Sequence, residues 1–318
     1  MAGAHDLFRS IPAGEAELLP LTGADGARLA LYRVTGGAGD RGRPPLLCGH
    51  ATGMAAGSYL PWFRMLSERV RVYAFDARGH GGSEGDGASV TLEALARDLL
   101  AAAEAACRDA KTDSLFYAAH SISGVAALHL GTALGAAPWR DLILFEPPVM
   151  VGAAHPRHAH ALADTLARAE RTERRRPSWP SHAAYRDRLQ SGGVFARFRP
   201  DMLDAHVQAT LRPDGAGGFR LACDPAVEGA FFRSVRSTEV WDSLPAFPLP
   251  ARFVGGDPGQ PDPGSEQARW VTAAAPDIAA RVPGARFGML GGCGHMMICE
   301  RPDACRDLVF AMVGEARP

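Results

Sequence analysis

The segment from Leu115 to Gly124 constrains the fold of this chain more than any other. It opens with the apolar run LFYAA, typical of a buried strand, and an alanine-rich stretch typical of a helix begins at Val125. Ser121 lies between the two. A strand-to-helix turn this sharp strains the serine backbone and exposes its hydroxyl, provided that the residues two before and two after are small. Ala119 and Ser123 meet this condition, so the segment predicts a nucleophilic serine.

Two further segments supply groups that a nucleophilic serine needs. His295 lies in the glycine-rich loop GGCGHM, directly after an apolar strand expected from Ala285 to Leu290. A base in that loop can reach the serine. Upstream, the run PLLC leads from Pro45 into the turn GHATG, whose free backbone N–H groups can hold a developing oxyanion. These elements predict acyl-transfer chemistry.

Taken together, these segments resemble the α/β-hydrolase superfamily, and the resemblance extends over nearly the whole chain. The motifs DARGHGGS at 76–83 and GH-x4-ERP at 294–302 also match it. The resemblance implies Ser121 as nucleophile, His295 as general base, and the backbone amides of Thr52 and Ile122 as the oxyanion hole. Two departures are visible: the serine turn lacks its usual flanking glycines, and the histidine before the oxyanion turn is followed by Ala51 instead of glycine.

The carboxylate that completes a Ser-His-acid triad is open among three residues. Such a carboxylate must accept the Nδ1–H of the base and stabilise the imidazolium as it forms. Asp257, in VGGDP, follows the strand where most of the superfamily keeps the acid, but its spacing from Gly255 is one residue short. Glu146, in LFEPP, ends the strand after the serine helix, from which other relatives supply a glutamate. Asp262 lies further along the loop of Asp257.

The order of elements predicts an α/β fold with a mostly parallel central sheet and helices on both faces. Short β-rich runs alternate with helical stretches, as βαβ crossovers require. The helix after Thr91 has an apolar stripe from Leu92 to Ala103, with Thr91 placed to cap it. The expected strands are 28–34, 46–48, 70–75, 115–119, 142–145 and 252–254.

About a hundred residues separate Glu146 from the strand at Arg252, far more than a crossover needs. The resemblance identifies this segment as a helical cap inserted after the sixth strand. We expect an α/β-hydrolase core at 1–146 and 250–318 and the cap at 147–249. Within the cap, the pattern predicts helices at 161–176, 181–189, 200–211 and 227–236, and a turn at 213–218.

The cap contains two groups of side chains with possible roles in binding. Apolar residues expected either to form an acyl pocket or to pack within the cap itself are Phe195, Phe198, Met202, Leu203, Phe231, Phe232 and Trp241. The cap also contains a set of basic residues. We expect them either to recruit a carboxylate, a phosphate or a coenzyme A ester, or to form a solvated face. They are Arg168, Arg171, Arg174, Arg175, Arg176, Arg186, Arg188, Arg197 and Arg199.

Composition and short motifs narrow the classes of protein to which this chain can belong. A net charge of −1 gives no bias toward nucleic acid, and no apolar run approaches the length of a membrane helix. The N-terminus lacks an apolar signal core, and the six cysteines form no C-x-x-C pair, so we expect a cytoplasmic protein without integral membrane association. No dinucleotide or Walker motif appears, and Cys293, His295 and Cys299 lack a second ligand cluster. We therefore expect neither a cofactor nor a metal.

On these grounds we expect the protein to hydrolyse the carboxylic ester bond of a small-molecule acyl substrate. A serine nucleophile argues against dehalogenase and epoxide hydrolase chemistry. The same scaffold also supports thioesterases and C–C bond hydrolases, and some proteins of this fold use the covered pocket as a receptor. These activities, and a non-catalytic ligand-binding protein, remain alternatives. A homodimer is compatible with the sequence.

Overall fold

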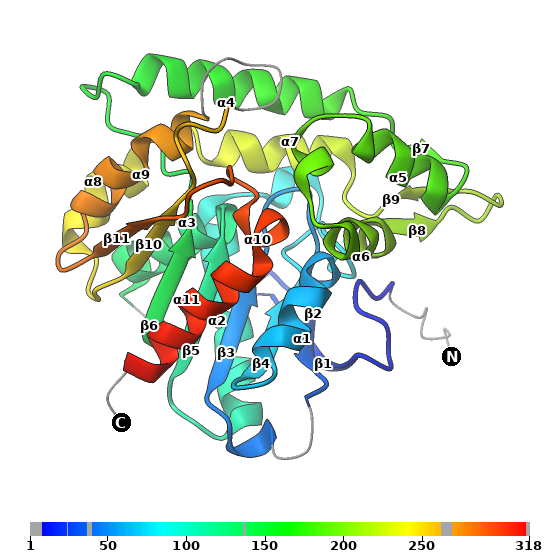
Figure 1. The fold of residues 1–318 in the computed structure, drawn as a ribbon, viewed down its shortest axis with the longest axis horizontal. Coiled ribbons are helices and arrows are strands. Elements are labelled where there is room, and N and C mark those ends of the chain that lie inside the picture. The colour runs from blue at the N-terminus through cyan, green and yellow to red at the C-terminus, as the bar shows by residue number, and fades with distance from the viewer. Residues whose placement is uncertain (1–7, 24, 37–39, 136–137, 262–268, 316–318) are drawn as a thin grey trace.

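The computed structural model describes residues 8–23, 25–36, 40–135, 138–261 and 269–315. In this part of the chain, eight strands form one sheet in the order β1-β2-β4-β3-β5-β6-β10-β11 (Figure 1). β1 and β2 pair antiparallel, as do β2 and β4, and the other neighbours are parallel. The strands are β1 (Ala16–Thr22), β2 (Arg28–Val34), β3 (Pro45–Gly49), β4 (Arg71–Phe75), β5 (Leu115–His120), β6 (Trp139–Phe145), β10 (Arg252–Gly255) and β11 (Arg286–Met289).

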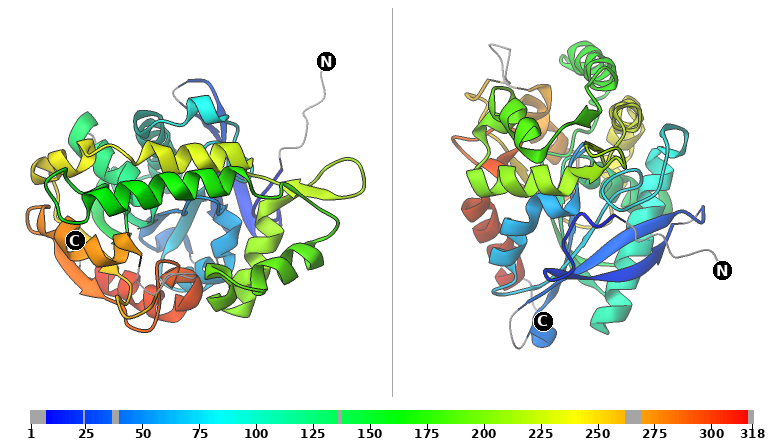
Figure 2. Two further views of the ribbon diagram at one scale, coloured as in Figure 1. Left: turned by 90° about the horizontal axis from the view of Figure 1, so that it is seen from above. Right: turned by 90° about the vertical axis from the view of Figure 1, so that its right-hand side faces the viewer.

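Helices cover both faces of the sheet, as the two views of Figure 2 show. The longer ones outside the segment between β6 and β10 are α1 (Leu60–Leu66), α2 (Leu92–Ala110), α3 (Ile122–His129), α9 (Trp270–Ala280) and α11 (Pro302–Glu315). Thr91 caps α2 by accepting the Ala94 N–H, as its position predicted. Short helical turns are η1 (Asp40–Gly42), η2 (Ala56–Tyr59), η3 (Gly87–Ser89), η4 (Leu130–Leu134) and α10 (Met297–Glu300).

Side-chain alternation along the central strands divides the core between the two faces. Leu142 and Leu144 of β6 pack in one cluster with residues of α2 and α3. Ile143 and Phe145 of the same strand pack in a second cluster with residues of α1 and α11. β6 therefore buries apolar side chains on both sides, as strands inside a parallel sheet do.

Between β6 and β10 the chain leaves the sheet, and we refer to this segment as the insertion. Figure 1 and the left view of Figure 2 show α4 and α7 side by side above the sheet. A small antiparallel sheet, β7-β9-β8, lies beside them. The insertion comprises α4 (His158–Glu173), β7 (Ser178–Trp179), α5 (His182–Gln190), η5 (Val194–Arg197), α6 (Pro200–Thr210), β8 (Leu211–Pro213), β9 (Phe219–Leu221), α7 (Pro225–Ser234), α8 (Glu239–Ser243) and η6 (Leu244–Ala246).

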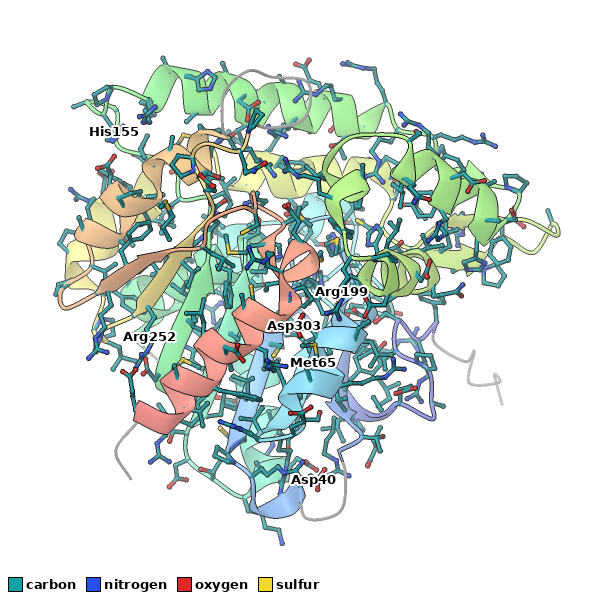
Figure 3. All side chains as sticks on the ribbon, in the orientation of Figure 1. Asp40, Met65, His155, Arg199, Arg252 and Asp303 are labelled. Atoms are coloured by element: carbon teal, nitrogen blue, oxygen red, sulfur yellow. The ribbon has the colours of Figure 1, made fainter. Side chains whose placement is uncertain are left out.

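Arg199, at the start of α6, ties the insertion to the helices on one face of the sheet. Its Nη1 donates to Asp303 at 2.8 Å, its Nη2 lies 3.9 Å from the sulfur of Met65, and its backbone N–H donates to Cys299 O at 2.9 Å (Figure 3). These contacts reach α11, α1 and α10. The arginine thus joins the insertion to three elements that lie far from it in the sequence.

The fold class agrees with the sequence prediction. The differences from that prediction are β1, the small sheet and α8. The sequence of β1 has no clear strand pattern of its own, and the strand forms by pairing with β2 along its whole length. The predicted turn at 213–218 is the tip of the β8–β9 hairpin, and β7 joins it to form the small sheet. Neither the small sheet nor α8 was predicted. Asp262 lies outside the described residues. Within the described ranges, no helix is both long and apolar enough to span a membrane.

Candidate active site

Ser121 lies in the turn between β5 and α3 with its backbone in an unusual conformation. Its φ is 57° and its ψ is −121°, in a region that side-chain-bearing residues rarely adopt. Its N–H donates to Phe145 O on the neighbouring strand at 2.9 Å, and its O accepts the Gly124 N–H at 2.9 Å. These bonds hold the strained turn in place.

The small residues around Ser121 are required by close contacts. Ser123 donates from its Oγ to His50 O at 2.6 Å, and Tyr117 donates to Ser123 O at 3.2 Å. A Cβ added to Gly49 on the adjacent strand would lie 2.5 Å from the Ser123 Cβ. The turn therefore packs against β3 with no room for a larger side chain at these positions.

His295 brings its imidazole between a hydroxyl and a carboxylate. Its Nε2 lies 3.1 Å from Ser121 Oγ, and its Nδ1 lies 2.9 Å from Glu146 Oε2. An ionised carboxylate can only accept, so Nδ1 carries the hydrogen in this contact. All three residues are buried, with Glu146 fully inaccessible. At these distances the imidazole can take a proton from the hydroxyl while the carboxylate stabilises the resulting imidazolium.

Glu146 is held by further hydrogen bonds from the core. Gly256 N–H donates to its Oε1 at 2.5 Å, and the Thr272 hydroxyl donates to its Oε2 at 3.0 Å. Burial raises the pKa of Glu146 above its usual value, and the Gly256 and Thr272 bonds act in the opposite direction. Its backbone φ of 43° lies in the left-handed region, so the side chain is aimed by a strained turn at the end of β6. No sequence pattern pointed to the contact between Thr272 and Glu146.

Asp257, the other candidate acid that the structure describes, does not contact His295. Its Oδ1 accepts the Gly259 N–H at 2.8 Å and its Oδ2 accepts the Gly292 N–H at 2.9 Å. These two bonds lower the pKa of Asp257. The side chain thus fastens two loops to each other at the surface. Of the candidate acids that the structure describes, it brings Glu146 and not Asp257 to the histidine.

The turn after β3 brings the Thr52 amide to the same pocket. The neighbouring amides are engaged: Ala51 N–H donates to Tyr59 Oη at 3.2 Å, and Gly53 N–H donates to His80 Nε2 at 3.1 Å. Among the described residues, no acceptor lies on the Thr52 N–H, and the same is true of the Ile122 N–H at the start of α3. Both residues line the pocket that contains Ser121. Two such amides can stabilise an oxyanion.

His120 is a bracing residue behind the site. Its Nε2 lies 2.8 Å from His295 O and its Nδ1 lies 2.7 Å from Tyr59 Oη. Burial is the main reason that its pKa falls to about 3, so the ring is neutral at physiological pH. It fixes the backbone of the loop that carries His295.

The pocket that contains Ser121 has a volume of about 230 Å³ and is roofed by the insertion. Of the predicted pocket residues, Phe195, Phe231 and Phe232 line it. Phe198, Met202 and Leu203 instead pack in the core cluster beside α1, and Trp241 packs under Arg281, which is the packing alternative that the sequence left open. The amphipathic pattern did not reveal which face of each cap helix meets the pocket.

Polar residues also line the roof of the pocket. Both Glu228 oxygens accept from Arg175 Nη1, at 2.7 and 2.6 Å, and Arg168 and Arg269 contribute further basic side chains. Among the described residues, no group of three or more His, Cys, Asp or Glu side chains is arranged to hold a metal ion.

Comparison with solved structures identifies the same fold in several enzymes. The chain is similar to E-2-(acetamidomethylene)succinate hydrolase, at 15% identity and a TM-score of 0.74 over 94% of this chain and 99% of that one. It is similar to the thioesterase domain from the curacin biosynthetic pathway, at 19% identity and a TM-score of 0.67 over 93% and 99%. It is also similar to a thermophilic esterase from Thermogutta terrifontis, at 19% identity and a TM-score of 0.65 over 95% and 100%.

At these identities the likeness shows the fold and not the substrate. No curated protein sequence matches the chain. The family evidence comes from a sequence-family model, described as the alpha/beta hydrolase family, which matches residues 37–308. This match covers most of the 318 residues. The chain therefore belongs to the alpha/beta hydrolase family.

Proposed function

We propose that this protein is a serine hydrolase that cleaves carboxylic esters, with Ser121 as nucleophile, His295 as general base and Glu146 as the triad acid. The observation that carries the proposal is the unbroken contact from Ser121 Oγ to His295 Nε2, at 3.1 Å, and from His295 Nδ1 to Glu146 Oε2, at 2.9 Å. Ser121 and His295 both line the pocket that the insertion roofs.

In the first half of the reaction, Ser121 Oγ forms a bond to the acyl carbon as its proton passes to His295 Nε2. The Thr52 and Ile122 amides stabilise the oxyanion. The bond to the leaving alcohol then breaks, and the alcohol takes the proton from His295. In the second half, water gives a proton to His295 Nε2 and its oxygen attacks the acyl carbon. The bond between that carbon and Ser121 Oγ then breaks, Oγ takes the proton back from His295, and the acid is released.

The insertion acts in this proposal as the cap over the reaction site, with the division at 147–249 expected from the sequence. Support comes from Thr165 and Thr172 of α4 and from Phe231 of α7, which line the pocket together with Ser121. The six cysteine thiols are all free and buried, which favours a reducing, cytoplasmic location.

Labelling with a fluorophosphonate probe tests the nucleophile directly. We expect wild-type protein to be labelled and to hydrolyse p-nitrophenyl esters with a preference for short acyl chains, because the pocket is about 230 Å³. Ser121→Ala should lose both properties. The matched control is Ser123→Ala, which removes a nearby hydroxyl that is engaged with His50 O. Wild type that neither labels nor turns over any ester would favour the ligand-binding alternative.

A further inference from the structure

A second cavity of about 600 Å³ lies in the insertion, and we call it the basic cleft. Its lining residues belong to the end of α4 and the loop after it, to β7, to α5, and to η5 and the residues before it. Among the described residues, none that lines it carries a carboxylate. Five of its ten lining residues are arginines, namely Arg171, Arg174, Arg175, Arg176 and Arg188. The concentration of like charge around one cavity predicts an anionic ligand.

The acidic residues nearby neutralise only part of this charge. Glu173 of α4 is paired with Arg233, outside the cleft. Arg171 has its nearest carboxylate oxygen, on Asp164, 4.0 Å away. Arg175 is paired with Glu228. In the described part of the chain, no carboxylate lies within 4.0 Å of the side-chain nitrogens of Arg174, Arg176 or Arg188. A ligand that brings negative charge would supply the missing partners.

Two of these arginines are already oriented. The Arg176 guanidinium stacks over the Trp179 ring at 4.6 Å, and its Nε donates to Ser178 O at 2.7 Å. Arg188 donates from its Nη1 to Ser191 Oγ at 3.2 Å. A planar guanidinium held in this way presents its remaining N–H groups as a fork that matches phosphate oxygens. Orientation before binding also lowers the entropic cost of recognition.

The basic cleft and the pocket that contains Ser121 share two wall residues, Arg175 and Phe195. The pocket itself, at about 230 Å³, is smaller than the roughly 300 to 1,000 Å³ of ordinary ligand sites. A small acyl group fits beside Ser121, but a bulky leaving group does not fit with it. The neighbouring cleft has the volume and the charge for such a group.

We infer that the basic cleft binds a phosphate-bearing leaving group, so that the substrate is an acyl ester or thioester of a phosphorylated carrier. The inference rests on the proposed function for acyl transfer at Ser121. In the reaction, the bond between the acyl carbon and the carrier's oxygen or sulfur breaks, and that atom takes the proton from His295. The phosphate groups stay unchanged and serve for binding.

Calorimetric titration of coenzyme A into the Ser121→Ala protein tests binding without turnover. We expect coenzyme A to bind, and pantetheine, which lacks its phosphates, to bind at least about tenfold more weakly. The double change Arg174→Gln with Arg188→Gln should weaken coenzyme A binding by at least about tenfold. The control is Arg186→Gln with Arg236→Gln, which removes the same charge from outside the cleft and should change affinity by less than about threefold.

The kinetic arm compares acetyl coenzyme A with p-nitrophenyl acetate on protein that retains Ser121. In the Arg174 and Arg188 double variant, KM for acetyl coenzyme A should rise, while turnover of p-nitrophenyl acetate should match wild type. Absence of coenzyme A binding, or equal weakening in the cleft and control variants, would overturn the inference even if p-nitrophenyl acetate is hydrolysed. Binding that depends on the cleft arginines, in a protein that hydrolyses neither compound, would instead overturn the proposed function and leave the anion site standing.

Discussion

The Nδ1 atom of His295 lies 2.9 Å from Oε2 of Glu146, although 149 positions separate the two residues in the chain. Glu146 directly follows β6, and His295 lies in the loop after β11, two strands further along the sheet. Ser121 follows β5, the other neighbour of β6. Because parallel strands bring their carboxyl ends to one edge, three separate connections meet at one point.

The first prediction concerns the identity of the acid. Glu146→Gln should lower kcat for ester hydrolysis by about 10²- to 10⁴-fold, because an amide no longer stabilises the correct tautomer and the imidazolium of His295. Asp257→Asn should lower kcat by less than about tenfold, since Asp257 contacts loop amides and not the histidine. Steady-state kinetics on both variants decide the matter. The reverse ranking would return the acid role to Asp257.

The second prediction is a pH dependence of stability at the same residue. Burial raises the pKa of Glu146 in the folded state above the unfolded value of 4.5, so above pH 4.5 the folded protein holds a proton that the unfolded chain has released. Stability from this group therefore falls as pH rises from 4.5 through the folded pKa. Glu146→Gln lacks this titration, so its Tm relative to wild type should increase over that interval.

Thermal unfolding of wild type and Glu146→Gln at a series of pH values from 4.5 to about 8 measures this difference. Asp257→Asn provides the control, because the titration of Asp257 lies below this pH range and its Tm difference from wild type should stay flat across it. Loop amides lower the pKa of Asp257, so its ionised form stabilises the folded state above the unfolded pKa. A Tm difference for Glu146→Gln that is flat or falls with pH would contradict the raised pKa.

The third prediction concerns His80 as a positioning residue for the oxyanion turn. Its Nε2 accepts the Gly53 N–H at 3.1 Å, and burial is the main reason that its pKa falls to about 3, so this nitrogen is unprotonated at neutral pH. His80→Leu leaves the Gly53 N–H without its partner and should displace the adjacent Thr52 amide. We expect kcat to fall by about tenfold with KM within about twofold of wild type.

His80→Gln, which keeps an acceptor on the side chain, should recover part of the loss in kcat. A role limited to stability would appear as a lower Tm in both variants with kcat/KM unchanged in the folded fraction. That result would show that the Thr52 amide does not depend on His80.

The fourth prediction concerns Asp76, which organises the loops beneath the site. Its Oδ1 accepts from Ser10 Oγ at 2.9 Å and Ala56 N–H at 2.8 Å, and its Oδ2 accepts from Gly82 N–H at 2.9 Å and Tyr32 Oη at 3.1 Å. Asp76→Asn turns one of these acceptors into a donor that faces other donors. We expect a loss of roughly 2 to 4 kcal/mol in the free energy of unfolding.

Urea denaturation measures the effect, with Asp113→Asn as a control on an exposed aspartate. A loss below about 0.5 kcal/mol for Asp76→Asn would mean that the loops rearrange to satisfy their own donors.

Local sequence patterns determined the fold class and two of the three residues at the centre of the site. The serine turn requires a strand, a small-residue frame and a helix within ten residues, and all of these appear between Leu115 and Gly124. His295 lies in a glycine-rich loop after a strand, which is likewise a local signal. The layers of the fold could be predicted from short β-rich runs that alternate with helical stretches and from the apolar stripe of α2. These patterns depend only on residues that are close together in the sequence.

Which of Glu146 and Asp257 lies beside His295, in contrast, was decided by tertiary structure. Both carboxylates follow a strand of the sheet, so no local pattern separates them. In the folded chain, the Gly259 and Gly292 amides hold Asp257 at the surface, while the Gly256 amide and the positive φ at Glu146 direct the glutamate inward. Tertiary structure also decided which residues line the pocket. The face that a cap helix turns toward Ser121 depends on packing between elements that are far apart in the sequence.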